Sequence, residues 1–263
     1  MAAKQSLFQY MLPCVVVALL GSVISTLFSA VLTGQMPDWE AMMQSTDVMR
    51  YWPQLARVYG LALGFSILIC PLTMGSYAFF TRVVNGDRPP VQSLFSWLGE
   101  GDKLRASYKA SLYYLLIGLK YTAMFSVPAG ALFYGAGLLL EKLPDIAALA
   151  LFFLAFLVFL AASVMGYLKI NAYLPAMYMI AENPALSVTD TFRRCGVMMK
   201  KRVWEFFVFR LSFLGWEILG AFTCGLTVLF VTPYLNLSVA AFTQEAEHRA
   251  GYAQLRREEN ERE

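Results

Sequence analysis

Charged side chains are scarce in this sequence. Asp, Glu, Lys and Arg make up only 15% of the 263 residues, whereas hydrophobic residues make up 58%. A soluble domain usually carries about 25% charged and about 45–50% apolar residues. The composition therefore excludes an ordinary soluble domain and predicts a protein embedded in the lipid bilayer. The formal net charge of +3 is too small to indicate nucleic acid as a partner.

The residues that usually hold metals and cofactors are also scarce. The only histidine, His248, lies in a charged tail. The cysteines form no CxxC pair and no zinc, haem or iron–sulfur spacing, and three of them lie in apolar runs, where a free cysteine behaves as a small hydrophobic residue. We therefore expect neither a metal site nor a cofactor. The cysteines are Cys14, Cys70, Cys195 and Cys224.

Motifs of catalysis are absent as well. The chain has no GxSxG, HExxH or P-loop motif, and no cluster of carboxylates falls on one face of a predicted helix. An intramembrane enzyme would need several polar residues at one depth, and the apolar runs do not offer them. We therefore predict that this protein is not an enzyme.

Long apolar runs are abundant, and they predict an all-α fold, a polytopic bundle of transmembrane helices. A membrane-spanning helix needs about 20 apolar residues. The first run, 7–32, exceeds the apolar core of a signal peptide, which is about 7–15 residues, so we interpret it as an uncleaved anchor. A second run lies between Arg57 and Arg82, a third covers about 110–140, and a fourth begins at Ile146. The fourth run continues too far for one crossing, and we expect a bend at Gly166 or Pro175.

The last apolar region, 206–244, is also too long for one crossing. As one helix it would reach nearly 60 Å, against a hydrocarbon core of about 30 Å. A turn at 223–225 would divide it into spans over 204–222 and 226–244, which gives six spans in total. In the alternative, one span ends at 232–234 and an interfacial helix follows, which gives five. We predict a membrane domain over 1–246 and a charged cytoplasmic tail over 247–263.

Basic residues gather in two loops, and this asymmetry predicts the orientation of the chain. Loops rich in Lys and Arg remain in the cytoplasm. With six spans, both termini are cytoplasmic; with five, the basic C-terminal tail would lie outside, against this rule. The basic residues of the two loops are Arg82, Arg88, Lys103, Arg105 and Lys109, and Arg193, Arg194, Lys200, Lys201 and Arg202.

The two basic loops resemble each other. The segments 84–98 and 181–195 both begin with a Pro-containing turn and reach a Phe. We predict that both form short amphipathic helices on the cytoplasmic face. The similarity suggests a 3+3 internal repeat of spans, although the shared chemistry of two interfacial segments explains it equally well.

A motif near the C-terminus carries a resemblance to a known family. It reads LSFxxWxxL, then a glycine, then a Pro-Tyr pair, and an acidic-Asn-Pro turn at 182–184 precedes it. With these residues the chain resembles a bacterial family of multi-pass membrane proteins, domain of unknown function 975. The resemblance implies a bacterial membrane protein with no assigned activity, and it supplies no catalytic residues. The motif positions are Ser212, Phe213, Trp216, Gly225, Pro233 and Tyr234.

Glu217 and Lys120 interrupt predicted spans and are the candidate intramembrane polar residues. A charge near the centre of the bilayer costs about 2.5–3.5 kcal/mol on insertion scales, unless it is paired or neutralised. Both residues lie about 11–14 residues, or roughly 16–21 Å, from the predicted cytoplasmic ends of their helices. They could form a site for protons or a substrate, or an ion pair that only supports the fold.

The second basic loop supplies candidate contacts to anionic lipid headgroups or to a protein partner. The alternative is that these charges serve only to orient the chain. Arg210 lies a turn or two inside the membrane, and its side chain is expected to extend back to the phosphates. The candidate residues are Arg193, Arg194, Lys200, Lys201, Arg202 and Arg210.

Two classes of function fit this sequence. The first is a non-enzymatic protein of the bacterial cell membrane: a scaffold, a partner-binding subunit or an envelope-homeostasis factor. Its partners would be anionic lipid headgroups and a membrane or cytoplasmic protein. The alternative is a small transporter or permease that uses Glu217 and Lys120 within the bundle.

Overall fold

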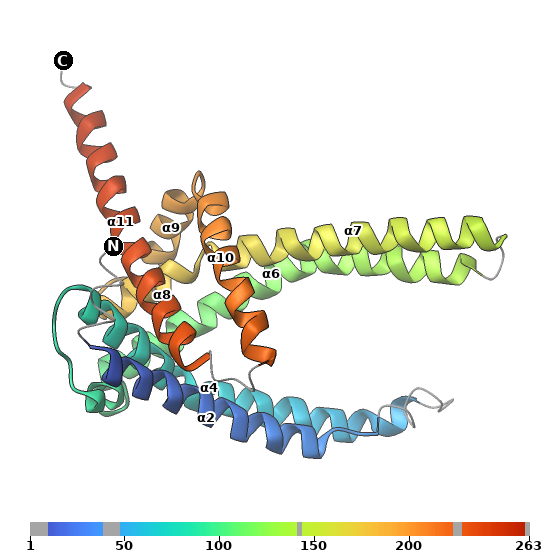
Figure 1. Cartoon of the computed structure of the whole chain (residues 1–263), viewed down its shortest axis with the longest axis horizontal. Helices are drawn as coiled ribbons and strands as arrows, with labels where there is room; N and C mark the ends of the chain where they lie inside the picture. Colours follow the sequence, from blue (N-terminus) through green and yellow to red (C-terminus); the bar gives the residue numbers. More distant parts are fainter. Residues whose placement is uncertain (1–9, 39–47, 141–143, 223–227, 261–263) are drawn as a thin grey trace. The chain divides into compact units, whose positions relative to one another are not determined.

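The computed structural model of the chain describes residues 10–38, 48–140, 144–222 and 228–260. Within these residues every regular element is helical, which confirms the all-α prediction (Figure 1). The side chains of some helical residues, including Glu217, lie outside this description.

Four segments are long and apolar enough to cross a membrane, as judged by length and composition: Met11–Gln35, Met49–Val84, Gly101–Leu139 and Ile146–Glu182. They coincide with the first four predicted spans and are typical of an integral membrane protein. The helices that form them are α2 (Met11–Gln35), α4 (Trp52–Val84), α6 (Gly101–Leu140), α7 (Asp145–Asn171) and α8 (Leu174–Glu182).

The fourth segment is divided between α7 and α8. The break falls at residues 172–173, directly before Pro175 in the first turn of α8. Proline suits this position because it has no N–H to donate and its fixed φ matches a helix start. The prediction of an interruption near Pro175 is therefore confirmed, whereas Gly166 lies within continuous helix.

The last apolar region forms two helices, α10 (Val203–Phe222) and α11 (Val228–Asn260). The first of these helices ends at Phe222 and the second begins at Val228, and the predicted turn at 223–225 lies outside the described residues. Neither helix is among the four membrane-length segments. α11 continues past residue 246, so the predicted boundary between membrane domain and tail falls within a helix. The fifth and sixth spans stay predictions.

The chain forms two compact units, and each contains segments that are distant in sequence. The first consists of Met1–Tyr108 and Gly215–Phe242, and the second of Lys109–Leu214 and Thr243–Glu263. α6, α10 and α11 therefore each contribute residues to both units.

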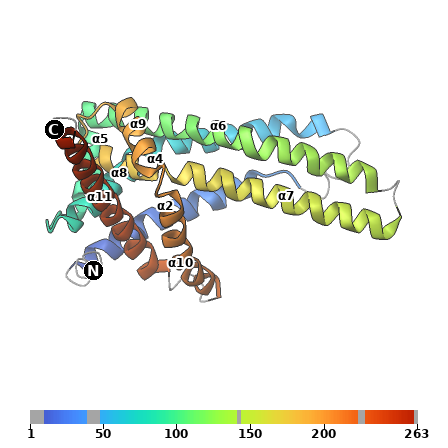
Figure 2. The ribbon, with the colours of Figure 1, turned by 90° about the horizontal axis from the view of Figure 1, so that it is seen from above.

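In the first unit, α2 and α4 lie side by side (Figures 1 and 2). Phe28 on α2 stacks on Phe65 of α4, with ring centroids 3.5 Å apart. After α4 the chain forms the short helices η2 (Val91–Phe95) and α5 (Ser96–Gly99) in the first basic loop. Before α4 lies η1 (Val48–Tyr51). The buried core of this unit contains Cys14, Val17, Phe79, Phe80, Val83, Leu94 and Leu237.

In the second unit, α6 and α7 lie side by side (Figure 1). Phe133 on α6 contacts Phe152 and Phe159 on α7, with ring centroids 5.5 and 5.9 Å apart. The second basic loop contains α9 (Val188–Met199), which packs on α8. Short helices thus follow both Pro-containing turns, at η2–α5 and at α9.

Candidate functional site

The helix α9 is held in place by one buried face. Before it, the Asn183 side-chain Oδ1 accepts a hydrogen bond from the Ala185 N–H at 3.2 Å, which fixes the turn. The ring of Phe192 is 1% exposed and lies 4.9 Å from the ring of Tyr113 on α6, measured between centroids. Helical periodicity places these buried residues on one side of α9: Thr191, Phe192, Cys195 and Met199.

The opposite face of α9 and the turn after it carry exposed positive charge. Arg193, Arg194, Lys200 and Lys201 are all exposed. Arg193 donates a hydrogen bond to the Asp190 carboxylate at 3.0 Å, yet its side chain remains 78% exposed. Such a surface ion pair contributes little to stability, so this arginine can exchange partners readily.

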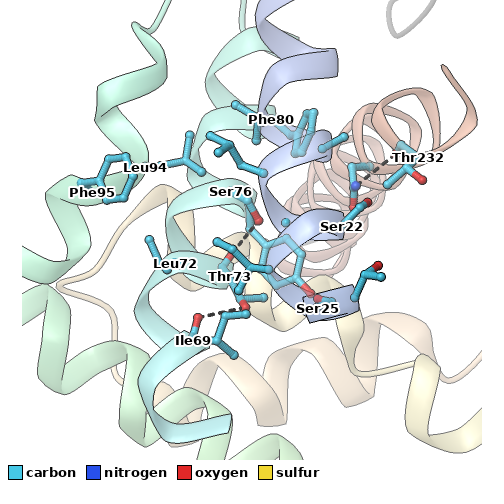
Figure 3. A pocket seen from close by; sticks show the side chains of 18 residues that line it. Ser22, Ser25, Ile69, Leu72, Thr73, Ser76, Phe80, Leu94, Phe95 and Thr232 are labelled. Atoms are coloured by element: carbon cyan, nitrogen blue, oxygen red, sulfur yellow. Dashed lines mark hydrogen bonds between the residues drawn. The ribbon is translucent and has the colours of Figure 1, made fainter. Parts of the chain in front are cut away.

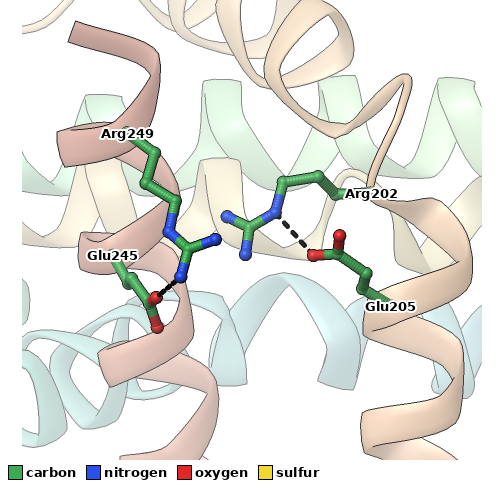
Figure 4. Close-up of polar contacts among 4 residues, drawn as sticks. All are labelled: Arg202, Glu205, Glu245 and Arg249. Carbon is green, nitrogen blue, oxygen red and sulfur yellow. Dashed lines mark hydrogen bonds and ion pairs between the residues drawn. The ribbon is translucent and has the colours of Figure 1, made fainter. Parts of the chain in front are cut away.

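Arg202 differs from these four residues, because its side chain is only 16% exposed. Its Nε donates a hydrogen bond to the Glu205 carboxylate at 2.8 Å (Figure 4). Arg249 on α11 likewise donates to Glu245, one turn earlier on its own helix (Figure 4). Arg210 is half-buried within α10. The predicted basic surface therefore separates into four outward-facing residues and two that are more enclosed.

Two titratable groups next to this surface have shifted pKa values. Burial raises the pKa of the Cys195 thiol to about 12, and its Sγ donates a hydrogen bond to the Ala172 carbonyl at 3.4 Å. This thiol is therefore protonated and unreactive at neutral pH. Burial, and after it the nearby carboxylate of Glu182, raise the pKa of the Glu247 side chain above its ordinary value.

The predicted pairing of Glu217 with Lys120 stays a prediction. Glu217 lies in α10, but its side chain is outside the described residues. Lys120 is exposed on α6, and its Nζ lies 5.6 Å from the centroid of the Tyr121 ring. The two residues belong to different units.

The family-motif residues occupy different environments. Phe213 is 7% exposed, Pro233 is buried inside α11, and Tyr234 is half-buried. Ser212 is exposed and donates a hydrogen bond to the Phe209 carbonyl at 2.6 Å, whereas Trp216 is 55% exposed. An exposed tryptophan on an apolar helix suits contact with lipid. Gly225 lies outside the described residues.

A cavity in the first unit was missed by the sequence analysis. Its volume is about 560 Å³, and its walls come from α2, α4, the η2 segment and α11 (Figure 3). Ser22 and Ser25 on α2 and Thr73 and Ser76 on α4 line it, and Thr232 lines it from α11 (Figure 3). The cavity thus places polar side chains between two membrane-length helices.

The sequence contains a signal for this cavity in the spacing of hydroxyl residues along α2. Side chains three or four residues apart share one face of a helix. This face continues beyond the cavity as an open surface of α2, and Ser25 and Thr26 belong to both. The hydroxyl residues on the face are Ser22, Ser25, Thr26, Ser29 and Thr33.

The described part of the chain combines membrane-length helices, a basic surface helix and a polar cavity between apolar helices. These features are typical of one class, the all-helical integral membrane proteins. The match to a family model is more specific. The family described as "Protein of unknown function (DUF975)" matches residues 3–250, so the chain belongs to this family and the resemblance stated above is confirmed. No curated protein and no solved structure matches the chain.

Proposed function

We propose that this protein is a non-enzymatic scaffold of the bacterial cell membrane that binds anionic lipid headgroups through α9. The observation that carries the proposal is the two-sided character of this helix. Phe192 and Cys195 fix one face within the second unit, while Arg193, Arg194, Lys200 and Lys201 point outward. Each Lys or Arg near an anionic membrane surface contributes about 1 kcal/mol, so a fixed set of four gives a useful preference for anionic lipid.

The proposal includes the topology that would bring this surface to the membrane. In it, α10 and α11 are the fifth and sixth spans, and the basic loops and both termini are cytoplasmic. The order of elements matches a 3+3 repeat only in part. α4, the η2–α5 segment and α6 correspond in order to α7–α8, α9 and α10, each set with proline in the turn before the short helix, while α2 precedes the first set and α11 follows the second. An envelope-homeostasis role would follow from sensing the anionic lipid content of the membrane.

Native mass spectrometry of the detergent-purified chain tests the proposal. The chain would be mixed with equal amounts of phosphatidylglycerol and phosphatidylcholine of the same acyl composition. We expect the wild type to retain phosphatidylglycerol preferentially, and the double variant Arg193→Gln/Arg194→Gln to lose this preference several-fold.

The matched control is Arg50→Gln/Arg57→Gln, which removes two exposed arginines from the first unit. If both double variants behave like the wild type, headgroup binding by α9 is wrong. Preferential crosslinking of α9 to a protein in cells, without lipid preference in the purified chain, would favour a partner-binding subunit instead.

A small transporter is the second candidate, and the polar cavity of the first unit supports it. A solute would need such a cavity between membrane-length helices. Glu217 is the candidate charged residue of this alternative, and Lys120 its candidate partner. In vesicles, Glu217→Gln would then alter proton or solute flux.

A double-mutant cycle separates this role from a structural ion pair. We expect Lys120→Met not to lower the melting temperature, because Lys120 is exposed on a membrane-length helix, where an apolar side chain is favoured. We also expect its effect to add to that of Glu217→Gln. If each single change destabilises and the double variant restores stability, the residues form a structural pair and the transporter loses its charged residue.

A further inference from the structure

We infer that the cavity of the first unit binds an uncharged lipid alcohol, a molecule with a hydrocarbon body and a free hydroxyl group. The inference does not depend on headgroup binding by α9, and it names a ligand for the cavity that the transporter alternative would use. It stands on the position of the cavity, the chemistry of its walls and its size.

The cavity extends from η2, in the first basic loop, to the middle of the membrane-length helix α2. Ser22 and Ser25 are near the middle of α2, a 25-residue helix of membrane length. The facing residues on α4 are Ile69, Thr73 and Ser76. A ligand at this depth enters from the bilayer more readily than from water, which favours a lipid.

The walls exclude a charged ligand. None of the described residues that line the cavity is charged. An ion placed there would lose its hydration and gain no counter-ion, which costs several kcal/mol. The phosphate of a phospholipid is therefore disfavoured, and the ligand is neutral.

Two of the hydroxyl groups on α4 favour a ligand that donates hydrogen bonds. Thr73 Oγ1 donates to the Ile69 carbonyl at 3.1 Å, and Ser76 Oγ donates to the Thr73 carbonyl at 2.7 Å (Figure 3). Since the Thr73 and Ser76 hydroxyls both donate their hydrogen bonds to backbone carbonyls of their own helix, their oxygens remain available to a ligand as acceptors. A hydroxyl group on the ligand supplies the matching donor.

The remaining walls favour a hydrocarbon body. Leu20, Ile24, Leu72 and Phe80 line the same cavity. A volume of about 560 Å³ falls within the range of about 300–1,000 Å³ typical of small-molecule sites. It is too large for a few water molecules, and it can hold the glycerol region of a diacylglycerol or the alcohol end of a prenol. Next to the cavity, the same face of α2 continues as an open surface along Ser29 and Thr33, against which the rest of the molecule would lie.

Photocrosslinking in nanodiscs tests the inference with the full chain. Three probes carry a diazirine in the same acyl chain: a diacylglycerol, its methyl ether and a phosphatidylglycerol. A fourth probe, a prenol with a diazirine, shows whether the alcohol comes from a diacylglycerol or from a prenol. We expect the diacylglycerol or the prenol to label residues 17–26 and 69–80 several-fold more than the ether or the phosphatidylglycerol.

Two variants test the walls of the cavity. Gly21 lines the cavity, and a Cβ built there meets no atom within 4 Å, so Gly21→Leu fills the cavity without a backbone clash. We expect it to reduce labelling several-fold. Gly118→Leu on α6 is the matched control, because Gly118 has the same open surroundings in the other unit. Thr73→Val/Ser76→Ala nearly keeps the space and removes the two acceptor hydroxyls, and it should abolish the advantage of the alcohol over its ether.

Three results would overturn the inference: labelling spread evenly along the membrane helices, equal labelling by phosphatidylglycerol, or unchanged labelling in Gly21→Leu while its melting temperature matches that of Gly118→Leu. If the cavity is labelled but the protein transports neither lipid nor solute, the inference is supported and the transporter alternative is wrong. The experiment therefore tests the two ideas separately.

Discussion

Gly75 is a residue at which α4 and η2 approach each other closely. A Cβ built at this position would lie 2.2 Å from the Leu94 carbonyl oxygen. Since the obstacle is backbone, relief requires the short helix to move. We expect Gly75→Ala to destabilise the protein by about 1–3 kcal/mol, as other overpacked sites do. Thermal unfolding in mild detergent measures the effect.

The control for this prediction is Gly64→Ala on the same helix, where a Cβ meets nothing within 4 Å. Alanine is favoured over glycine in a helix by about 1 kcal/mol, so this change should be neutral or stabilising. Equal melting temperatures for the two variants would contradict the close approach at Gly75.

Glu247 gives a pH-dependent prediction. Its pKa is raised in the folded protein, so burial of the ionised carboxylate reduces stability once the pH exceeds the ordinary carboxyl pKa. Below that pH the group is protonated in both states and this cost is absent. We expect Glu247→Gln to be more stable than the wild type at neutral pH, with the difference closing as the pH falls toward 4.5, the ordinary value for this group. A difference independent of pH would refute this explanation.

At the scale of the element, α9 depends on Phe192 for its position. Removing a buried phenylalanine side chain costs about 3–5 kcal/mol. We expect Phe192→Ala to release α9 and to speed maleimide labelling of Cys195, which is buried in the wild type. Cys70 is the internal reference, because it is buried in the other unit, where its Sγ donates to the Ser107 carbonyl at 3.3 Å. If Cys195 and Cys70 gain reactivity equally, the whole fold has loosened and α9 has no separate docking.

The sequence predicts elements well where hydrophobicity alone determines them. α2, α4, α6 and α7 follow from apolar runs, because a run of about 20 apolar residues needs only its own composition to become a membrane helix. The short helices after Pro90 and Pro184 follow from turn chemistry. The ends of helices are harder to predict. α11 extends through the charged tail, because the residues on both sides of the expected boundary have similar helix propensities and none of them ends the helix.

The cavity could not be predicted in the same way. It depends on which faces of α2, α4 and α11 meet, and side-chain spacing on one helix does not specify its neighbour. The hydroxyl spacing from Ser22 to Thr33 gives a candidate face, but only the packing turns that face into a cavity wall. The sequence predicts that the α9 region is basic, because the charged residues can be counted. It does not predict that the Arg202 side chain is enclosed, because this depends on its ion pair with Glu205.

At the scale of the whole molecule, the topology is the main prediction. Six spans place both termini in the cytoplasm, whereas five place the tail outside. We expect a reporter that is active only in the cytoplasm to work at either end, and one that is active only outside to fail at both. Activity of the outside reporter at the C-terminus would establish five spans and would move the end of α11 away from the basic loops.

The close approach of Gly75 to the Leu94 carbonyl restricts which amino-acid substitutions can be accepted at these two positions during evolution. Most tight contacts join two side chains, so a larger residue at one position is compensated by a smaller one at the other, and the two positions covary. Here the second partner is a carbonyl oxygen that every amino acid carries. No replacement at Leu94 makes room for a Cβ at Gly75. Homologous sequences that keep this packing should therefore retain glycine at the first position while the second varies independently.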